Sequence, residues 1–250
     1  MKPSAETAFL FFLVFARLLP MSILSPALGA RLLNGRVRLV ICAALSLCLL
    51  PAVPEEKVTF SLMELMHQLV IGTILGFLSS LPFYAMQSVG EWLDVNRGET
   101  IVSVLIPQFA SRTSSSGRLF LLLSTLLFFL IGGHHELLSA LAESFRIPDA
   151  GNPFQGIVMD FGEAEMARVM IDRVGLVFSI AVKVSLPAVC VLWMTDIFLG
   201  YLNRLAPALQ VFYLGLPVKL WLGVLILAVL LDGMVRTTVD LLELGWIFAA

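Results

Sequence analysis

Charged residues are scarce in this sequence. Asp, Glu, Lys and Arg make up 14% of its 250 residues, whereas 59% are hydrophobic. A soluble domain usually carries about 25% charged residues, so this chain has too few polar groups to coat a water-soluble globule. The charges nearly cancel, with a formal net charge of −2, and neither end carries a charged tail. This composition excludes an ordinary soluble enzyme and a basic nucleic-acid-binding protein, and it predicts a membrane protein.

Signatures of catalysis and of metal or cofactor binding are also missing. The sequence contains no G-x-S-x-G, no Walker loop and no G-x-G-x-x-G. His134 and His135 open an H-H-E sequence, which lacks the spacing of the zinc-binding motif H-E-x-x-H. Cys42, Cys48 and Cys190 lie in apolar runs without a C-x-x-C pair, so we expect buried structural thiols. We therefore expect no enzyme activity, no cofactor and no metal site.

Long apolar segments are abundant. A helix needs about 20 apolar residues to cross a bilayer core. Six segments approach that length, at residues 8–29, 38–53, 62–89, 119–142, 174–199 and 211–235. The first has some features of a secretory signal, but Arg17 interrupts it and Pro20 follows, so we expect it to stay in the mature protein. No repeat divides the sequence, which predicts one all-α membrane domain over residues 1–250.

Several charges lie inside these apolar segments. Each Arg, Lys or Asp at the centre of a membrane helix costs about 2.5–3.5 kcal/mol on insertion scales. Lys183 and Asp196 would lie about 20 Å apart on one helix, so they cannot neutralise each other. Either they reach the membrane interface, or other helices, other subunits or water surround them. Basic residues divide almost evenly between the two sides of a six-pass arrangement, which leaves the topology open.

Proline adds a second sign of unusual helices. Pro82, Pro187, Pro207 and Pro217 each remove a backbone donor, and each is expected to bend or end a helix. We expect 196–219 to form a helix, a break between Arg204 and Pro207, and a second helix starting near Pro217. Broken helices at membrane depth are tolerated where protein or water surrounds the freed carbonyls. The sequence thus predicts helical hairpins buried in an assembly.

The connection at residues 90–118 contains polar and apolar parts. Asp94 and Arg97 have the spacing of a local ion pair if the chain is helical there. The apolar run at 100–106 is too short to cross a bilayer, and it is either a hairpin that enters and blocks a pore or a simple loop. Farther upstream, Gly72 and Gly76 form a G-x-x-x-G pattern that lets another backbone approach closely.

These patterns together resemble the FliR/SctT family of type III secretion export-apparatus proteins. The C-terminal family pattern is filled by Asp196, Gly200, Asn203, Arg204, Pro207, Gln210, Val211, Phe212, Pro217 and Lys219. The N-terminal part is matched by Arg17, Pro26, Arg38 and Pro51. The middle is matched by Gly90, Asp94, Arg97, Gly98, Pro107 and Gly117. Its D-x-x-R-G form resembles the injectisome (SctT) branch more than the flagellar branch, although Asn96 stands where the family pattern has Gln.

The resemblance implies a non-enzymatic component of the bacterial inner membrane, within a secretion-system basal body that serves virulence. One copy would join SctR-like and SctS-like subunits in a helical, conical export gate through which secreted proteins pass unfolded. An SctU-like switch protein and an SctV-like export gate would be neighbours. The family's plug loop would fall on Leu105, Ile106, Pro107, Gln108 and Phe109. The remaining motif residues, with Arg17 and Lys183, would pack within the chain or against these subunits.

A secondary transporter of a small solute is the main alternative from another functional class. Lys183 and Asp196 would then form a substrate or proton site near the membrane midplane. Inverted repeats, which many such transporters carry, are not visible in the sequence. A membrane-embedded enzyme is a weaker alternative, because no nucleophile or metal set is present.

Overall fold

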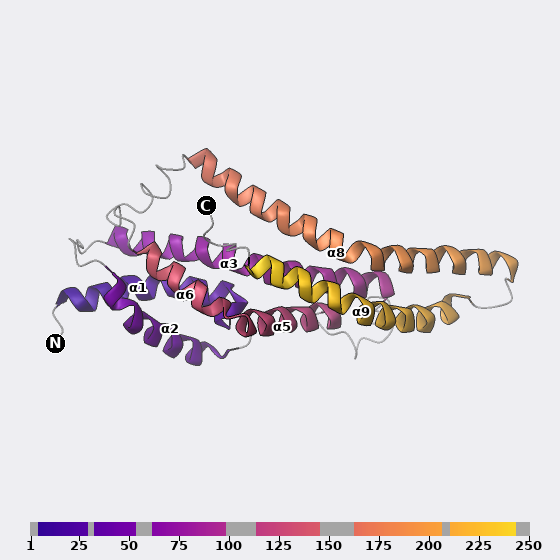
Figure 1. Cartoon of the computed structure of the whole chain (residues 1–250), viewed down its shortest axis with the longest axis horizontal. Coiled ribbons are helices and arrows are strands. Elements are labelled where there is room, and N and C mark those ends of the chain that lie inside the picture. Colours follow the sequence, from indigo (N-terminus) through magenta and orange to yellow (C-terminus); the bar gives the residue numbers. More distant parts are fainter. Residues whose placement is uncertain are drawn as a thin grey trace. The chain divides into compact units, whose positions relative to one another are not determined.

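The computed structural model describes residues 5–29, 33–53, 62–98, 114–145, 163–206 and 211–243. Within these ranges every regular element is a helix, which confirms the predicted all-α class (Figure 1). The elements are α1 (Ala5–Leu24), η1 (Pro26–Leu28), α2 (Gly35–Leu49), η2 (Leu50–Ala52), α3 (Leu62–Arg97), α5 (Ser115–Leu130), α6 (Gly133–Ser144), α8 (Glu163–Leu205) and α9 (Val211–Glu243).

All six predicted apolar segments are helical, but their ends differ from the prediction. Helix α3 runs through the first part of the expected polar connection and ends at Arg97. Within GEWLDVNR, Leu93, Asp94 and Arg97 are buried while Trp92 and Val95 are exposed. Its charges are satisfied on the buried face, so they do not end the helix.

The predicted segment 119–142 is two helices. Helix α5 ends at Leu130 and α6 begins at Gly133. Gly132 separates them in the left-handed region, with φ of 79°. Glycine adopts this conformation without the steric cost that other residues have, which explains why the helix breaks here.

Proline ends fewer helices than the sequence predicts. Pro82, Pro187 and Pro217 all lie inside helices, and α9 begins at Val211, so the predicted start near Pro217 is wrong. A proline inside a long helix removes one hydrogen bond, which the remaining turns tolerate. The predicted break at the end of α8 is confirmed, because α8 stops at Leu205. The next residue, Ala206, precedes a proline, and this position disfavours the helical conformation.

The chain divides into two compact units. The first comprises Met1–Leu81, Phe128–Gly175 and Leu242–Ala250, and the second comprises Pro82–Leu127 and Leu176–Leu241. Helices α3, α5 and α8 each contribute one part to each unit, and the last two residues of α9 belong to the first unit. Each unit is described separately below, and one domain over residues 1–250 stays a prediction.

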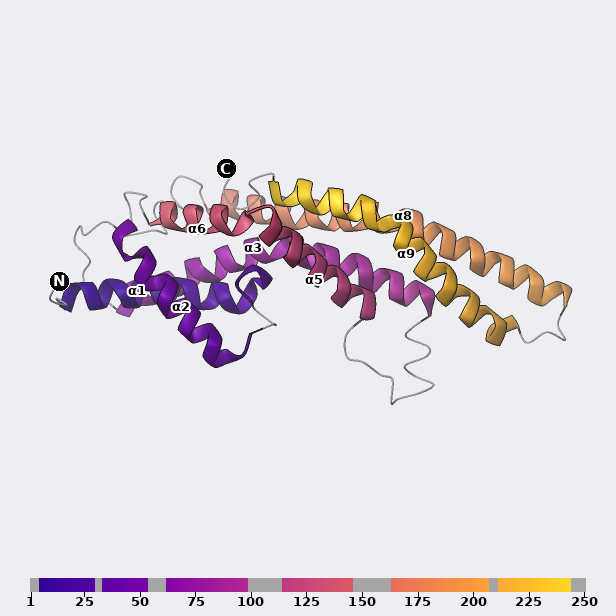
Figure 2. The same ribbon diagram turned by 60° about the horizontal axis from the view of Figure 1, so that its bottom comes forward.

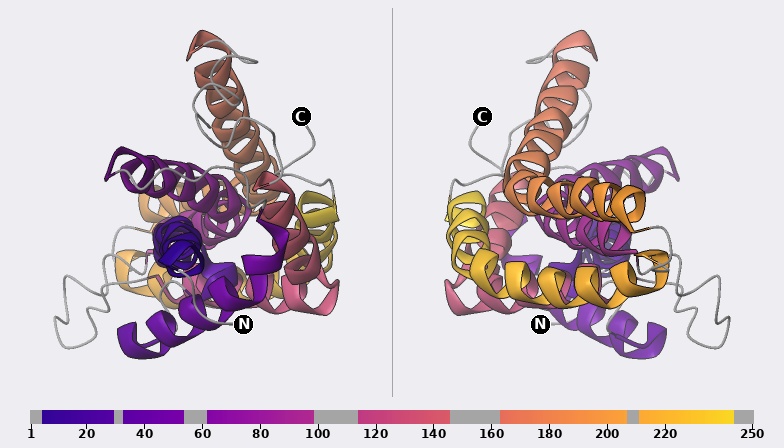
Figure 3. Two further views of the ribbon diagram at one scale, coloured as in Figure 1. Left: turned by 90° about the vertical axis from the view of Figure 1, so that its left-hand side faces the viewer. Right: turned by 90° about the vertical axis from the view of Figure 1, so that its right-hand side faces the viewer.

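In the first unit, α1 packs against α2 and against the start of α3. Figures 1 and 2 show α1 and α2 side by side, and the left panel of Figure 3 views α1 nearly end-on. The predicted close packing at the two glycines of α3 is confirmed. A Cβ on Gly72 would overlap the Arg17 carbonyl, and one on Gly76 would lie 2.7 Å from Met21 Cα. The absence of side chains thus lets α1 and α3 touch backbone to backbone.

In the second unit, the second part of α8 and α9 form a hairpin. Figures 2 and 3 show α9 returning alongside α8, and a Cβ on Gly215 would lie 2.9 Å from a methyl of Leu199. The second part of α3 and the first part of α5 complete this unit. Its buried apolar side chains include Phe83, Met86, Leu93, Phe120 and Leu192.

Three described helices are long and apolar enough to cross a membrane, over Thr7–Leu24, Leu62–Arg97 and Met170–Leu205. A fourth is obtained if α5 and α6 count as one broken span. The apolar helical stretch at Gly215–Val229 is shorter. Burial differs strongly among these spans, since 61% of the apolar window in α3 is buried but only 22% of that in α8.

The cysteines depart from expectation. Cys42 is buried, but Cys48 and Cys190 are exposed on this chain, and all three are free thiols. The sequence shows that each lies in an apolar run, but it does not show which face of the helix packs. Cys190 lies on the poorly covered helix α8, which explains its exposure.

Candidate functional site: a polar clasp, a buried arginine and a charged hairpin

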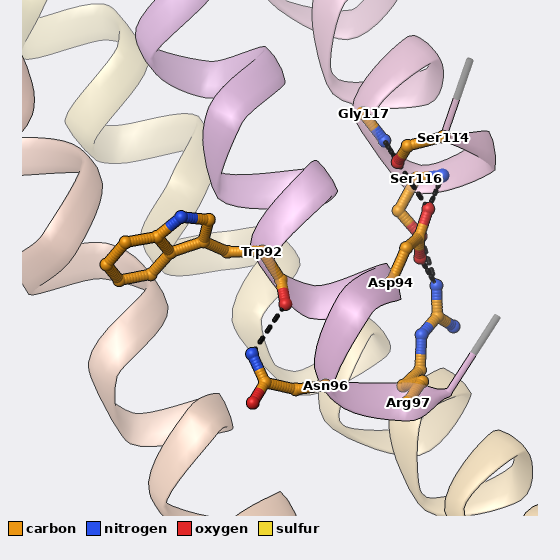
Figure 4. A network of polar contacts seen from close by, with 7 residues as sticks. All are labelled: Trp92, Asp94, Asn96, Arg97, Ser114, Ser116 and Gly117. Carbon is orange, nitrogen blue, oxygen red and sulfur yellow. Dashed lines mark hydrogen bonds and ion pairs between the residues drawn. The ribbon is translucent and has the colours of Figure 1, made fainter. Parts of the chain in front are cut away.

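The first candidate site lies where α3 ends and α5 begins. Asp94 and Arg97 form an ion pair one helical turn apart, and both are buried (Figure 4). The predicted local pair is therefore confirmed. Arg97 also donates a hydrogen bond to Ser116 Oγ. Ser114 Oγ donates to Asp94 Oδ2, which also accepts the Ser116 backbone N–H at 2.8 Å. We call these four residues, Asp94, Arg97, Ser114 and Ser116, the clasp.

The clasp pairs the charges of Asp94 and Arg97, and it provides hydrogen-bond acceptors for the free N–H groups at the N-terminus of α5. The first N–H groups of a helix have no partner within it, and the positive end of the helix dipole favours a nearby anion. Asp94 supplies that anion to α5 from a different helix. Ser114 is the N-cap of α5, since its Oγ accepts the Gly117 N–H at 2.9 Å. A buried charge is tolerated only when it is paired and hydrogen-bonded, and the clasp meets that condition for Asp94.

Glycines allow helices α3, α5 and α9 to pack closely at the clasp. A Cβ on Gly90 would lie 2.5 Å from Gly117 N, so α3 and α5 touch backbone to backbone. Gly98, with φ of 85°, ends α3 in the left-handed conformation typical of helix C-termini. On α9, a Cβ on Gly223 would overlap Cγ and Cδ of Arg97. The aliphatic part of Arg97 therefore lies directly on the backbone of α9.

Asn96 serves a separate connection on the other side of α3. Figure 4 shows it turned away from Asp94, and its amide donates to the Trp92 carbonyl at 2.7 Å. The Trp193 indole N–H donates to Asn96 Oδ1 at 2.9 Å, which links α3 to α8. Trp92 packs edge to face on Phe178, with ring centroids 6.5 Å apart. The position next to the ion pair therefore holds α8 and is not part of the clasp.

Arg17 forms the second site, within the first unit. It is 2% exposed, and its Nε donates to Gln68 Oε1 at 2.7 Å. One terminal nitrogen donates to Ser144 O and Ser144 Oγ at 3.2 and 2.9 Å. The guanidinium carbon lies 3.9 Å from the ring centre of Phe145, in cation–π geometry. Gln68 in turn donates to Glu64 at 2.9 Å, so this carboxylate is linked to Arg17 through Gln68. This one side chain joins α1, α3 and the end of α6.

The third site is the α8–α9 hairpin. Asp196 and Lys219 form an ion pair across it, with 48% and 17% of their side chains exposed. Lys183, Asn203 and Arg204 are exposed on α8. Lys183 and Arg204 have no ion pair within the described ranges. Lys183 and Asp196 both lie on α8, about 20 Å apart at helical spacing, so this chain does not bring them into one site.

The other predicted residues have simple locations. Pro217 is inside α9 and exposed, and Phe212 lies in the first turn of α9. Pro207 and the proposed plug residues Leu105, Ile106, Pro107, Gln108 and Phe109 lie outside the described residues. Among the residues that are described, no cluster of three or more His, Cys, Asp or Glu could hold a metal ion.

Sequence reasoning missed several partners. The serine-rich stretch at 113–117 received no role from the sequence, yet Ser114 and Ser116 belong to the clasp. A serine just before an apolar helical segment is an N-cap signal, so Ser114 could have been recognised. No sequence signal identifies Gln68 and Phe145 as neighbours of Arg17, or Gly223 as the surface on which Arg97 lies.

Comparison with known proteins assigns the family. The family model described as "Bacterial export proteins, family 1" matches residues 8–244. The flagellar biosynthetic protein FliR of Pectobacterium carotovorum subsp. carotovorum is 29% identical, over 88% of this chain and 84% of the relative. The Yop proteins translocation protein T of Yersinia pestis is 28% identical, over 88% and 84%. The secretion system apparatus protein SsaT of Salmonella typhimurium is 30% identical, over 87% and 83%. The chain belongs to the FliR/SctT family of bacterial export proteins.

Proposed function

We propose that this chain is a non-enzymatic core component of a type III protein secretion export gate in the bacterial inner membrane. It forms part of the channel through which secreted proteins pass unfolded. Family membership over nearly the whole chain supports this function, and the relatives from Yersinia and Salmonella are secretion or translocation proteins by name. At least three helices long and apolar enough to span a membrane support the location.

The observation that carries the proposal is the surface of α8. This long apolar helix is the least covered of the three spans, yet it exposes Lys183, Asn203 and Arg204. Exposed charges on a membrane helix are costly against lipid, so those that do not reach the membrane interface need protein or water around them. Large apolar side chains such as Trp193 and Phe198 are exposed beside them. A face that mixes large apolar groups with charges suits a neighbouring subunit better than hydrocarbon.

The partners follow from the family. SctR-like and SctS-like subunits cover this surface in a complex that holds one copy of the chain. An SctU-like switch protein and an SctV-like export gate adjoin it. The D-x-x-R-G sequence at Asp94–Gly98 favours the injectisome branch and a role in virulence, while relatives of both branches have similar identities.

The barrier of the closed channel lies in the segment between the two ends of the clasp. Residues Leu105–Phe109 form the plug, with Phe109 as its bulky apolar group. The remaining motif residues position this segment or pack against subunits, and they have no chemical role. The clasp at Asp94 supports this reading, because it ties together the two described ends of the segment.

No observation favours the transporter alternative. Its site requires Lys183 and Asp196 to converge, whereas Asp196 pairs with Lys219 on the neighbouring helix. Asp94 and Arg17 form their hydrogen bonds within the chain, which leaves them unsuited to bind a solute.

Co-purification tests the proposal. The chain is expressed alone and together with its SctR-like and SctS-like neighbours, and each product is weighed by native mass spectrometry. We expect one large complex with a single copy of this chain, and an unstable or polydisperse product from the chain alone. A well-behaved monomer that transports a radiolabelled solute would contradict the proposal.

A further inference from the structure

The Arg97 side chain contacts residues of its own helix α3 and of helices α5 and α9. Its charged end is held by Asp94 of α3 and by Ser116 at the start of α5. Its aliphatic stem lies on Gly223 of α9, and the side chain is 8% exposed. Arg97 Nε is buried and has no hydrogen-bond partner within the described residues. Arg97 therefore links the clasp to the backbone of α9.

Gly223 is explained by this contact. Glycine in the middle of a helix is unfavourable relative to alanine, so a helix interior usually avoids it. Here any Cβ would overlap the Arg97 stem, and it would also lie 3.0 Å from the unpaired Nε. We call this contact between Gly223 and the aliphatic part of Arg97 the seat. It is a steric contact, because glycine has no side chain that could interact with Arg97. Arg97 can keep both its ion pair and its position only while residue 223 has no side chain.

We propose that Arg97 is a positioning residue that couples α9 to both described ends of segment 99–113. Asp94 and Ser116 join these two ends, and the Gly223 seat fixes their common ion pair against α9. If α9 shifts, Arg97 must leave the seat, and the ion pair that holds the two ends together is disturbed. A packed contact of this kind has discrete arrangements and does not deform continuously. This inference rests on the proposed function, in which that segment is the channel barrier.

The critical variant is Gly223→Ala, because it fills the seat without removing a polar atom. Arg97→Ala removes the stem and the charge together. The double variant R97A/G223A combines them, and in it the added methyl has no stem to displace. The conservative variant Arg97→Lys keeps a positive charge and an aliphatic stem. The resting ion conductance of each assembled complex is measured in planar bilayers, with SctR-like and SctS-like subunits present.

We expect G223A and R97A each to raise the resting conductance on the order of tenfold, the change that corresponds to a lost interaction of about 1.4 kcal/mol. R97A/G223A should conduct no more than R97A, because the two changes act on one contact. R97K should stay close to the unmodified complex. Effects that add in the double variant would show that residues 97 and 223 act independently, which would overturn the inference.

Two control variants distinguish loss of the Gly223–Arg97 contact from a non-specific effect of changing α9. Gly215→Ala is the matched control on α9, since its methyl meets only the flexible end of Leu199. The double variant D232A/R236A removes an exposed ion pair of α9 whose side chains are 77% and 78% exposed. Neither should raise the conductance. A G215A complex that leaks as much as G223A would overturn the inference.

A deletion of residues 105–109, which keeps Ser114 and Ser116 of the clasp, separates the inference from the proposed function. If the deletion leaks but G223A and R97A do not, Arg97 does not position the barrier and the proposed function stands. If the subunits fail to assemble with the unmodified chain, the proposed function itself fails. If the complex assembles but the deletion does not leak, the plug assignment fails.

Discussion

Arg17 Nε donates a hydrogen bond to Gln68 Oε1 at 2.7 Å, which joins two helices through residues far apart in the sequence. Both side chains are almost completely buried. The backbone of the same arginine touches Gly72 one turn along α3. Arg17 therefore positions α1 on α3 both through a hydrogen bond and through close backbone packing.

Replacing Arg17 with alanine should destabilise the first unit. The change leaves the buried Gln68 Oε1 without this donor, removes the hydrogen bonds to Ser144, and opens a space beside Phe145. Buried unsatisfied groups cost about 1–3 kcal/mol each, so we expect a loss of about 3 kcal/mol. Arg17→Lys should recover only part of this, because lysine lacks the planar fork and stacks less well on a ring. Thermal unfolding of the assembled complex in detergent measures both, and an unchanged R17A midpoint would contradict the structural role.

Gly72→Ala should separate α1 from α3. The added methyl would overlap the Arg17 carbonyl, and backbone cannot move as easily as a side chain. Overpacking of this kind costs about 1–3 kcal/mol. Gly175→Ala is the matched control, since it lies in helix α8 with nothing near its added methyl. G175A should leave the unfolding midpoint unchanged or raise it, and equal losses from both variants would argue against close packing.

The Asp196–Lys219 pair can be tested by charge reversal. Asp196→Lys or Lys219→Asp alone places like charges across the α8–α9 hairpin, and the double reversal restores an attractive pair. We expect each single change to lower assembly and the double change to restore much of it. The energy involved is modest because Asp196 is about half exposed. Assembly is read from the yield of the co-purified complex, and no rescue by the double reversal would mean that the two residues act separately.

Thiol labelling can test whether a partner covers α8. Cys190 is exposed on α8, whereas Cys42 is buried in the first unit. In the detergent-solubilised chain a maleimide should modify Cys190 and leave Cys42 unmodified until the protein is denatured. In the assembled complex Cys190 should become protected, with Cys48 replaced by serine to simplify the readout. Equal labelling of Cys190 before and after assembly would show that this face of α8 stays open.

The sequence alone determined the class of the protein, the number of its apolar segments and the family. These follow from composition and from residues close together in the chain, such as the Asp94–Arg97 pair one helical turn apart. The sequence did not predict every helix end correctly. Helix α3 continues to Arg97 because Asp94 and Arg97 are paired on its buried face. Local sequence does not show whether a charge will find a partner.

Only the tertiary structure decided which distant groups meet. Gln68, Ser144 and Phe145 surround Arg17, and Gly223 supports Arg97, although nothing in their local sequence marks them as neighbours. The physical reason is that burial and pairing depend on which helix faces pack together. Periodicity within one segment fixes the faces of a helix, but the contact between two helices is set by both surfaces at once.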